Sequence, residues 1–203
     1  MICQKTKTAF LFTSLIFCVT SYTLAQEADW QLKKDKEGIQ VYTRESSNSD
    51  LDEFKGIGII NASVDKLVST LKDADQMHQW ANCKTSRLIL LEGNEQVNYT
   101  ITEVPFPMQD RDSYTRLEYL EVKNGVKVKI TAIPGFKPAN DGMTRIPYLN
   151  GFWLFERISD TQSEITYQLQ ADPGGSIPAW MSNAGSVDTP FDAIKNLRDY
   201  LED

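Results

Sequence analysis

The sequence predicts one domain of the α+β class, in which a curved antiparallel sheet wraps around a long C-terminal helix. Alternating apolar and polar residues mark a series of short strands between Ile39 and Ala171, because successive side chains of a strand point to opposite faces. Between Ile177 and Leu201 the apolar residues instead recur every three or four positions, which is typical of an amphipathic helix. A twisted sheet that holds one helix leaves room for an internal hydrophobic cavity between them.

The first 25 residues are typical of a secretory signal peptide. Lys5 and Lys7 precede an apolar run at residues 9–19, and the small residues around Ala25 offer a cleavage site. The apolar run is short for a membrane span, and an uncleaved membrane anchor is the alternative. We therefore expect an exported protein, periplasmic or secreted, whose mature domain covers residues 26–203.

Charge and residue counts narrow the range of partners. Without the signal peptide, 178 residues remain with 19 basic and 28 acidic side chains, a net charge of −9. This charge argues against a nucleic-acid partner and allows at most transient membrane contact. Cys83 is then the only cysteine and His78 the only histidine, so we interpret both as structural and expect no internal disulfide, no metal site and no cofactor.

The elements of the mature domain are expected in a definite order. A short helix or turn near Trp30 precedes a strand hairpin whose polar turn lies at residues 46–50. Ser63 can cap the next helix, residues 64–73, because apolar residues follow it at helical spacing. A helical turn is expected at 75–80, and strands are expected at 39–43, 54–60, 86–91, 96–104, 113–122, 126–133, 152–159 and 164–171.

Two features break this regular pattern. Pro190 lies inside the predicted terminal helix at 177–201, so we expect a kink or an irregular stretch at 186–190. Earlier, the stretch PFPMQDRDSY at 105–114 ends one strand and begins the next. Its prolines cannot donate to a sheet.

The side chains of this junction are expected to hold a fixed bend. Phe106 can fill the adjacent core, while Asp110 and Asp112 can accept hydrogen bonds from the backbone or from Arg111. Direct contact between Arg111 and a ligand is the alternative interpretation.

Several stretches resemble the START domain, the lipid-transfer module related to steroidogenic acute regulatory protein. They are WQLKKDKEGIQVYTR at 30–44, VDKLVSTLKD at 64–73 with the later Trp80, the proline junction, and RIPYLNGFWLFER at 145–157 followed by the terminal helix. The resemblance covers residues 30–201. It implies the helix-grip fold, shared with Bet v 1-like proteins, and a cavity that holds one hydrophobic molecule, commonly a sterol, a phospholipid or a related lipid.

The leading hypothesis for function is non-covalent binding, extending to transfer, of a single hydrophobic lipid-like ligand by a monomer. Motifs of common hydrolases, phosphate-binding loops and zinc enzymes are absent from the sequence, so we expect no catalytic residues and no enzymatic activity. The alternatives are an aromatase/cyclase-type enzyme of the same superfamily, acting on a polyketide-like substrate, and a plain interaction module. The loop at 134–150, which Gly135, Gly142 and Gly151 bracket, is a candidate gate for the cavity.

Candidate ligand-binding residues are of two kinds. Glu103 and Arg116 flank the proline junction, and a buried pair of opposite charge could orient a ligand hydroxyl; an exposed cross-strand pair is the alternative. The enzyme hypothesis would use these two residues together with Arg145 and Tyr167. Aromatic and aliphatic residues would form the apolar walls. The candidate cavity-lining residues are Trp80, Tyr99, Ile101, Glu103, Arg116, Arg145, Trp153, Phe155, Tyr167, Trp180, Ala184, Phe191 and Ile194.

Overall fold

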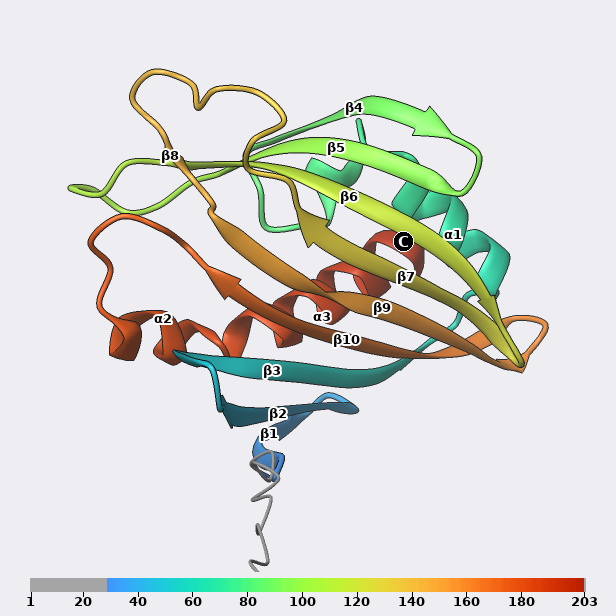
Figure 1. Cartoon of the computed structure of the whole chain (residues 1–203). Helices are drawn as coiled ribbons and strands as arrows, with labels where there is room; N and C mark the ends of the chain where they lie inside the picture. Colours follow the sequence, from blue (N-terminus) through green and yellow to red (C-terminus); the bar gives the residue numbers. More distant parts are fainter. Residues whose placement is uncertain (1–28, 203) are drawn as a thin grey trace, which may run out of the picture.

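The computed structural model describes residues 29–202, and the predicted signal peptide lies outside the described residues. A long sheet curves around the C-terminal helix (Figure 1), so the predicted α+β class and helix-grip architecture are confirmed. All eight strands expected from the sequence are present. The described strands are β1 (Gln31–Lys36), β2 (Ile39–Ser46), β3 (Ser49–Ile60), β4 (Thr85–Glu92), β5 (Glu95–Thr102), β6 (Arg111–Val122), β7 (Gly125–Ala132), β8 (Thr144–Arg145), β9 (Tyr148–Ser159) and β10 (Gln162–Asp172).

The strands follow the order β1-β2-β3-β10-β9-β7-β6-β5-β4, and every neighbouring pair along this path is antiparallel. The short strand β8 pairs in parallel with the beginning of β6. Most neighbouring strands in this order are also neighbours in the chain. The pairing of β3 with β10 is an exception, and it joins the first three strands to the last strand of the chain.

The first strand, β1, was not predicted. The sequence suggested a short helix or turn near Trp30, but residues 31–36 pair with β2. Glu37 and Gly38 have φ values of 54° and 70°, which is the backbone geometry of a tight hairpin turn. A register shift between Leu32 and Lys34 interrupts the alternation that identifies a strand, which explains why the sequence pattern was misleading.

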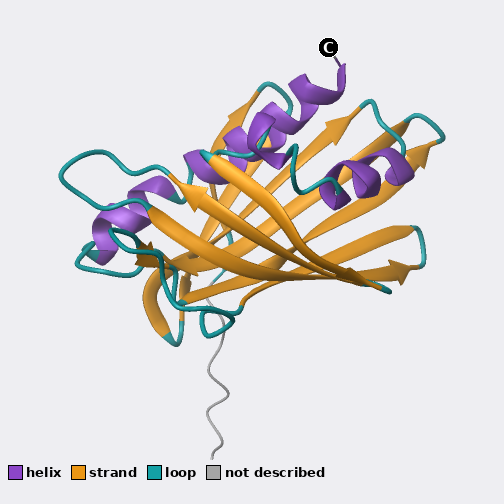
Figure 2. Ribbon diagram, turned by 90° about the horizontal axis from the view of Figure 1, so that it is seen from above, coloured by secondary structure: helices purple, strands orange, loops and turns teal. Residues whose placement is uncertain are grey.

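Helix α1 (Val64–Lys72) begins where the sequence predicted. The Ser63 hydroxyl accepts a hydrogen bond from the backbone N–H of Lys66 at 3.2 Å, which satisfies one of the free donors of the first turn. Val64, Leu67 and Leu71 are buried, and the helix packs against β7 and β9. The short 3-10 helix η1 (Met77–Gln79) follows. Together they cover one end of the sheet (Figure 2).

The C-terminal segment forms two helices, α2 (Ala179–Gly185) and α3 (Asp188–Glu202). The helix predicted at 177–201 is therefore present in two parts that begin at Ala179, and the irregular stretch expected at 186–190 is confirmed at residues 186–187. Pro190 is the third residue of α3. The N–H groups in the first turn of a helix make no hydrogen bond within the helix, so a proline is tolerated there. The helix is therefore interrupted before Pro190 and not at it.

Helix α3 contacts the sheet most closely at β3. A Cβ atom added to Gly56 would lie 2.9 Å from Ile194 Cδ1 and 3.0 Å from Pro190 Cβ, so a larger residue here would force α3 side chains to shift. Phe191, Ile194 and Leu197 are buried against β2, β3 and β10. Because the helix is held at this side of the sheet, space remains between it and the strands β5 and β6.

Candidate functional site

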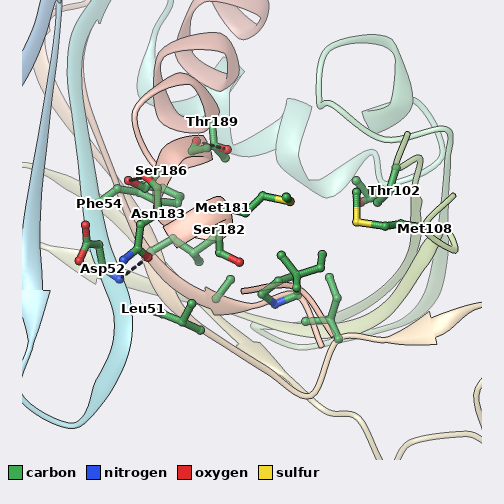
Figure 3. A pocket seen from close by; sticks show the side chains of 17 residues that line it. Leu51, Asp52, Phe54, Thr102, Met108, Met181, Ser182, Asn183, Ser186 and Thr189 are labelled. Carbon is green, nitrogen blue, oxygen red and sulfur yellow. Dashed lines mark hydrogen bonds between the residues drawn. The ribbon is translucent and has the colours of Figure 1, made fainter. Parts of the chain in front are cut away.

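Two adjoining cavities lie between the helices and the sheet. The outer cavity, of about 380 Å³, lies beside α2 and the loop between β5 and β6, and Figure 3 shows Met181 facing Thr102 and Met108 across it. The inner cavity, of about 210 Å³, lies beneath η1 and the start of α3. Thr102 and Thr189 line both cavities. The two cavities therefore adjoin, and the outer one has the volume of a small-molecule site. Together they are called the hollow.

Three of the predicted aromatic residues form one wall of the inner cavity. Trp153 and Tyr167 stack with ring centroids 3.9 Å apart, and Trp80 meets Trp153 edge to face at 6.4 Å. Burial raises the pKa of the Tyr167 hydroxyl, so this group stays protonated in the neutral pH range. Phe155 is part of the solid core rather than of the wall.

A second group of lining residues is polar and comes from β5 and β6. Asn98, Thr100 and Thr102 lie at alternate positions of β5, so they share a face, and all three line the inner cavity. Thr115 of β6, the register partner of Asn98, lines it as well. The sequence analysis missed these residues, although polar residues at every second position of both strands are a detectable signal.

Two predicted cavity residues, Tyr99 and Ile101, lie on the other face of the sheet. Tyr99 belongs to a second apolar cluster with Val97 and Tyr114, and Ile101 packs against that cluster. The assignment of the face was wrong by one residue, and a shift of one position in a strand moves every side chain to the opposite side. Sequence reasoning took the apolar face of β5 as the cavity face, because it did not anticipate a second core.

The charged pair predicted inside the cavity does not form. Glu103 lies 3.8 Å from Lys84, and Arg116 lies 3.7 Å from Glu95, with all four side chains about half exposed or more. Arg116 belongs to the face of β6 that carries Tyr114, away from the cavities. The alternative, an exposed cross-strand pair between Glu103 and Arg116, does not form either, because each residue pairs with another side chain at the surface.

Arg145 forms a buried ion pair, but its partner is Asp112. Arg145 Nε and Nη2 lie 2.8 and 2.9 Å from the two carboxylate oxygens, and Asp112 is fully buried. The hydrogen bonds from Arg145 lower the pKa of the Asp112 carboxyl. The guanidinium also donates to the carbonyl groups of Pro134, Lys137 and Pro138. Arg145 therefore holds the backbone of this loop and lines neither cavity.

This arrangement also revises the loop predicted at 134–150. Residues 144–145 form β8 on the edge of β6, and β9 begins at Tyr148, so Gly151 lies inside a strand. A Cβ atom at Gly151 would come within 2.1 Å of the Gln168 carbonyl oxygen. The pairing of β8 with β6 and of β9 with β10, which shortens the predicted loop, was not visible in the sequence.

The proline junction is a fixed bend, as the first interpretation expected. Arg111 is buried, and its Nε and Nη2 donate to the carbonyl oxygens of Pro173 and Gly174 at 3.2 and 3.3 Å. It thereby ties the junction to the loop that precedes α2. Asp110 and Asp112 accept backbone hydrogen bonds, from Val104 and Asn140, as expected. The arginine that pairs with Asp112 is Arg145, not Arg111, and Phe106, expected in the core, is 96% exposed.

Four predicted residues of the terminal helices fall into two groups. Phe191 and Ile194 are buried in the core under α3. Trp180 is 70% exposed and Ala184 is exposed, because the break at residues 186–187 lets α2 turn a different face to the sheet. Met181, beside Trp180, lines the outer cavity instead.

Cys83 and His78 have structural contacts. Cys83 lines the inner cavity, and burial raises the pKa of its thiol, which makes it a weak nucleophile. His78 contacts the Asp75 carbonyl oxygen through Nδ1 at 2.8 Å. Within residues 29–202 there is no group of three His, Cys, Asp or Glu side chains placed to hold a metal ion.

Comparison with known proteins agrees with this geometry. The model of the START domain family matches residues 19–202. The chain belongs to the START domain family. The resemblance inferred from the sequence motifs is thereby confirmed, and the match covers the whole described domain.

Similar START proteins occur in bacteria and mammals. An uncharacterised protein of Pseudomonas aeruginosa is 29% identical over 194 residues, 95% of each chain. The mouse phosphatidylcholine transfer protein is 30% identical over 164 residues, which are 77% of this chain and 76% of that protein. The crystal structure of a STAR-related lipid transfer protein from Xanthomonas axonopodis has a TM-score of 0.81 and 37% identity, and the match covers 86% of this chain and 99% of that one.

Proposed function

We propose that this START protein is an exported, monomeric carrier that binds one hydrophobic lipid-like molecule non-covalently and exchanges it at a membrane surface. The observation that carries the proposal is the elongated hollow between helices and sheet, whose outer part is lined mainly by apolar residues. Burying apolar surface there is favourable by about 25 cal/mol per Å². Several similar proteins are named as lipid transfer proteins, which supports the same role here.

The composition of the inner cavity favours binding over catalysis. Among the described residues that line it there is no Asp, Glu, Lys, Arg or His. Cys83 and Tyr167 are its titratable side chains, and burial raises the pKa of both, away from the range in which general acids and bases work. The four residues considered for an enzyme do not converge, since only Tyr167 lines this cavity. We therefore propose that the protein has no enzymatic activity.

Two exposed aromatic residues, Phe106 and Trp180, form an apolar rim beside the outer cavity. Phe106 lies in the β5–β6 loop between the cavity residues Val104 and Met108, and the exposed Trp180 precedes the cavity residue Met181. Figure 1 shows this loop and α2 at the same end of the molecule. Aromatic rings of this kind insert into the boundary between lipid headgroups and acyl chains. No helix among residues 29–202 is long and apolar enough to cross a membrane, so we propose transient contact through the rim.

Monomeric behaviour is supported by the edge strand β1. It carries Lys33, Lys34 and Lys36 and a register shift, and both features oppose pairing with a second sheet edge. Export rests on the order of basic, apolar and small residues at positions 1–25. N-terminal sequencing of the native protein should find a start at or near Gln26, and an intact Met1 would contradict export with cleavage.

The central test is the occupancy of the purified protein. Native mass spectrometry of protein from its own host should find about one lipid-like molecule per chain, because the two adjoining cavities together have room for one elongated ligand. Solvent extraction then identifies the molecule. An empty cavity, together with failure to bind any sterol, phospholipid or fatty acid offered, would exclude the proposal.

A second prediction concerns the rim. Replacing Phe106 and Trp180 with serine should reduce co-sedimentation with zwitterionic phospholipid vesicles about tenfold or more, because two large rings no longer insert. Ligand occupancy should not change, since neither ring lines a cavity. The matched control is Tyr200→Ser, another exposed aromatic near the opposite end of α3. Equal vesicle binding of the double variant and the control would contradict a membrane-contacting rim.

A further inference from the structure

The inner cavity has a polar wall built only from uncharged side chains. The register of β5 and β6 pairs Asn98 with Thr115 and Thr100 with Ser113, and side chains of paired residues lie on the same face. Three of the four line the cavity, and Ser113 lies two residues before Thr115 on that face. The result is a patch of amide and hydroxyl groups in the same cavity as the aromatic wall.

Three polar atoms of this region have no hydrogen-bond partner among the described residues. They are Trp80 Nε1, Asn98 Nδ2 and Ser113 Oγ, and all three residues are more than nine-tenths buried. Buried polar groups without partners are rare in folded proteins and destabilising. Two of the three atoms can only donate. A partner for Trp80 Nε1 or for Asn98 Nδ2 must therefore be an acceptor.

Neighbouring hydrogen bonds fix which atom of Asn98 is left free. Gln96 Nε2 faces the carbonyl oxygens of Leu71 and Lys72 at 3.3 Å, and Gln96 Oε1 accepts from the Tyr119 hydroxyl at 3.0 Å. With its amide in this orientation, Gln96 Nε2 donates to Asn98 Oδ1 at 2.7 Å. The oxygen of Asn98 is thus satisfied, and its amide nitrogen remains without an acceptor.

The described walls of both cavities also lack a positive charge. No charged residue lines the inner cavity, and Asp52 is the charged residue of the outer one. The buried Arg111 donates to backbone carbonyl groups, and Arg145 is paired with Asp112. A phosphate or carboxylate in the inner cavity would therefore be a buried charge without a counter-ion, which is strongly unfavourable.

We propose that the inner cavity binds an uncharged polar group of the ligand, a hydroxyl, ester or ketone oxygen that accepts a hydrogen bond from Asn98 Nδ2 or Trp80 Nε1. The apolar remainder of the ligand extends into the outer cavity, whose wall includes Leu51, Phe54 and Leu169. This assignment rests on the proposed function and adds the substrate class: a neutral lipid rather than one with a phosphate or carboxylate headgroup.

A competition between matched lipids tests the assignment on the wild-type protein. Delipidated protein is offered an equimolar mixture of monooleoylglycerol, oleoyl-lysophosphatidylcholine and oleoyl-lysophosphatidate, which share one acyl chain. Native mass spectrometry should find the uncharged lipid retained about tenfold or more over either charged one, because only its polar group enters the inner cavity without an unpaired charge. Cholesterol against cholesteryl sulfate gives the same comparison for a ring-shaped ligand.

The outcomes separate the two proposals. Equal retention, or a preference for a charged lipid, would overturn the neutral-ligand assignment while lipid binding itself stands. Retention of no lipid from either set would contradict the proposed function, and the assignment with it.

A substitution tests the donor directly. Trp80→Phe keeps an aromatic ring in the wall and removes Nε1, so the affinity for monooleoylglycerol should fall about fivefold while that for octadecane, which has no acceptor oxygen, stays unchanged. Met77→Leu alters the same wall without removing a donor and should leave both affinities within about twofold. Equal losses for the two ligands in Trp80→Phe would show a packing role and contradict hydrogen bonding by Nε1.

Discussion

Asp112→Asn should lower the free energy of unfolding by about 3 kcal/mol. The substitution keeps the shape of the side chain but removes its charge, so the guanidinium of Arg145, only 11% exposed, loses its counter-ion. The loop that Arg145 holds through the carbonyl groups of Pro134, Lys137 and Pro138 should loosen at the same time. Urea denaturation of the two purified proteins, followed by circular dichroism, measures the difference.

An exposed ion pair provides the matched control. Glu95→Gln removes the partner of Arg116 in a pair whose side chains are about half exposed, and the expected change is about 0.5 kcal/mol or less. A loss for Asp112→Asn no larger than this would show that the buried pair does not contribute as its geometry indicates.

The same pair makes a prediction about pH. The hydrogen bonds from Arg145 hold the pKa of Asp112 below its usual value of 3.8. The stabilisation is therefore complete above that usual value and is lost as the pH falls through the lower pKa of the folded state. Wild type should lose stability more steeply than Asp112→Asn on acidification below about pH 4. Parallel pH profiles of wild type and Asp112→Asn would contradict a lowered pKa of Asp112 in the folded protein.

Local sequence patterns predicted the elements of this fold well. Ser63 followed by apolar residues at helical spacing located α1 within one residue at its end, and the alternating runs located eight strands. Both signals depend on residues close together in the chain. The resemblance of four stretches to the START domain then implied the helix-grip fold, which the structure confirms.

The candidate site was predicted less well, because it depends on contacts between distant residues. Which face of β5 meets the cavity depends on a second apolar cluster around Tyr99 and Tyr114, and this cluster exists because the loop held by Arg145 covers that part of the sheet. The orientation of Trp180 likewise depends on the break between α2 and α3. Neither the second apolar cluster nor the effect of this break on Trp180 can be inferred from the spacing of neighbouring residues.

The position of the cavity follows from glycines rather than from large residues. Gly56 and Gly58 of β3 let α3 approach the sheet so closely that Ile194 would meet a Cβ atom at 2.9 and 3.1 Å. A helix held this near one side of a curved sheet cannot also fill the far side. The space beside β5 and β6 is therefore a consequence of close packing at β3, and it should respond to changes in α3.

Ala193→Phe should abolish most ligand binding. Ala193 projects from α3 and lines the inner cavity of about 210 Å³, and a phenyl ring would occupy much of that volume. We expect ligand occupancy to fall about tenfold or more, because the polar end of the ligand loses its place. Native mass spectrometry of wild type and variant, purified in the same way, measures the bound fraction.

The control uses the same change on the other terminal helix. Ala184 of α2 is exposed and lines neither cavity, so Ala184→Phe adds an equal volume and equal hydrophobicity without entering the hollow. Its occupancy should match that of wild type. Filling an existing cavity adds contacts and costs at most about 1–3 kcal/mol where the fit is poor, so Ala193→Phe should remain folded, with a cooperative thermal transition. A folded Ala193→Phe variant with full occupancy would place the ligand outside the inner cavity. Loss of ligand from both variants would show that a bulky residue on either helix disturbs binding without entering the cavity, and it would contradict the prediction.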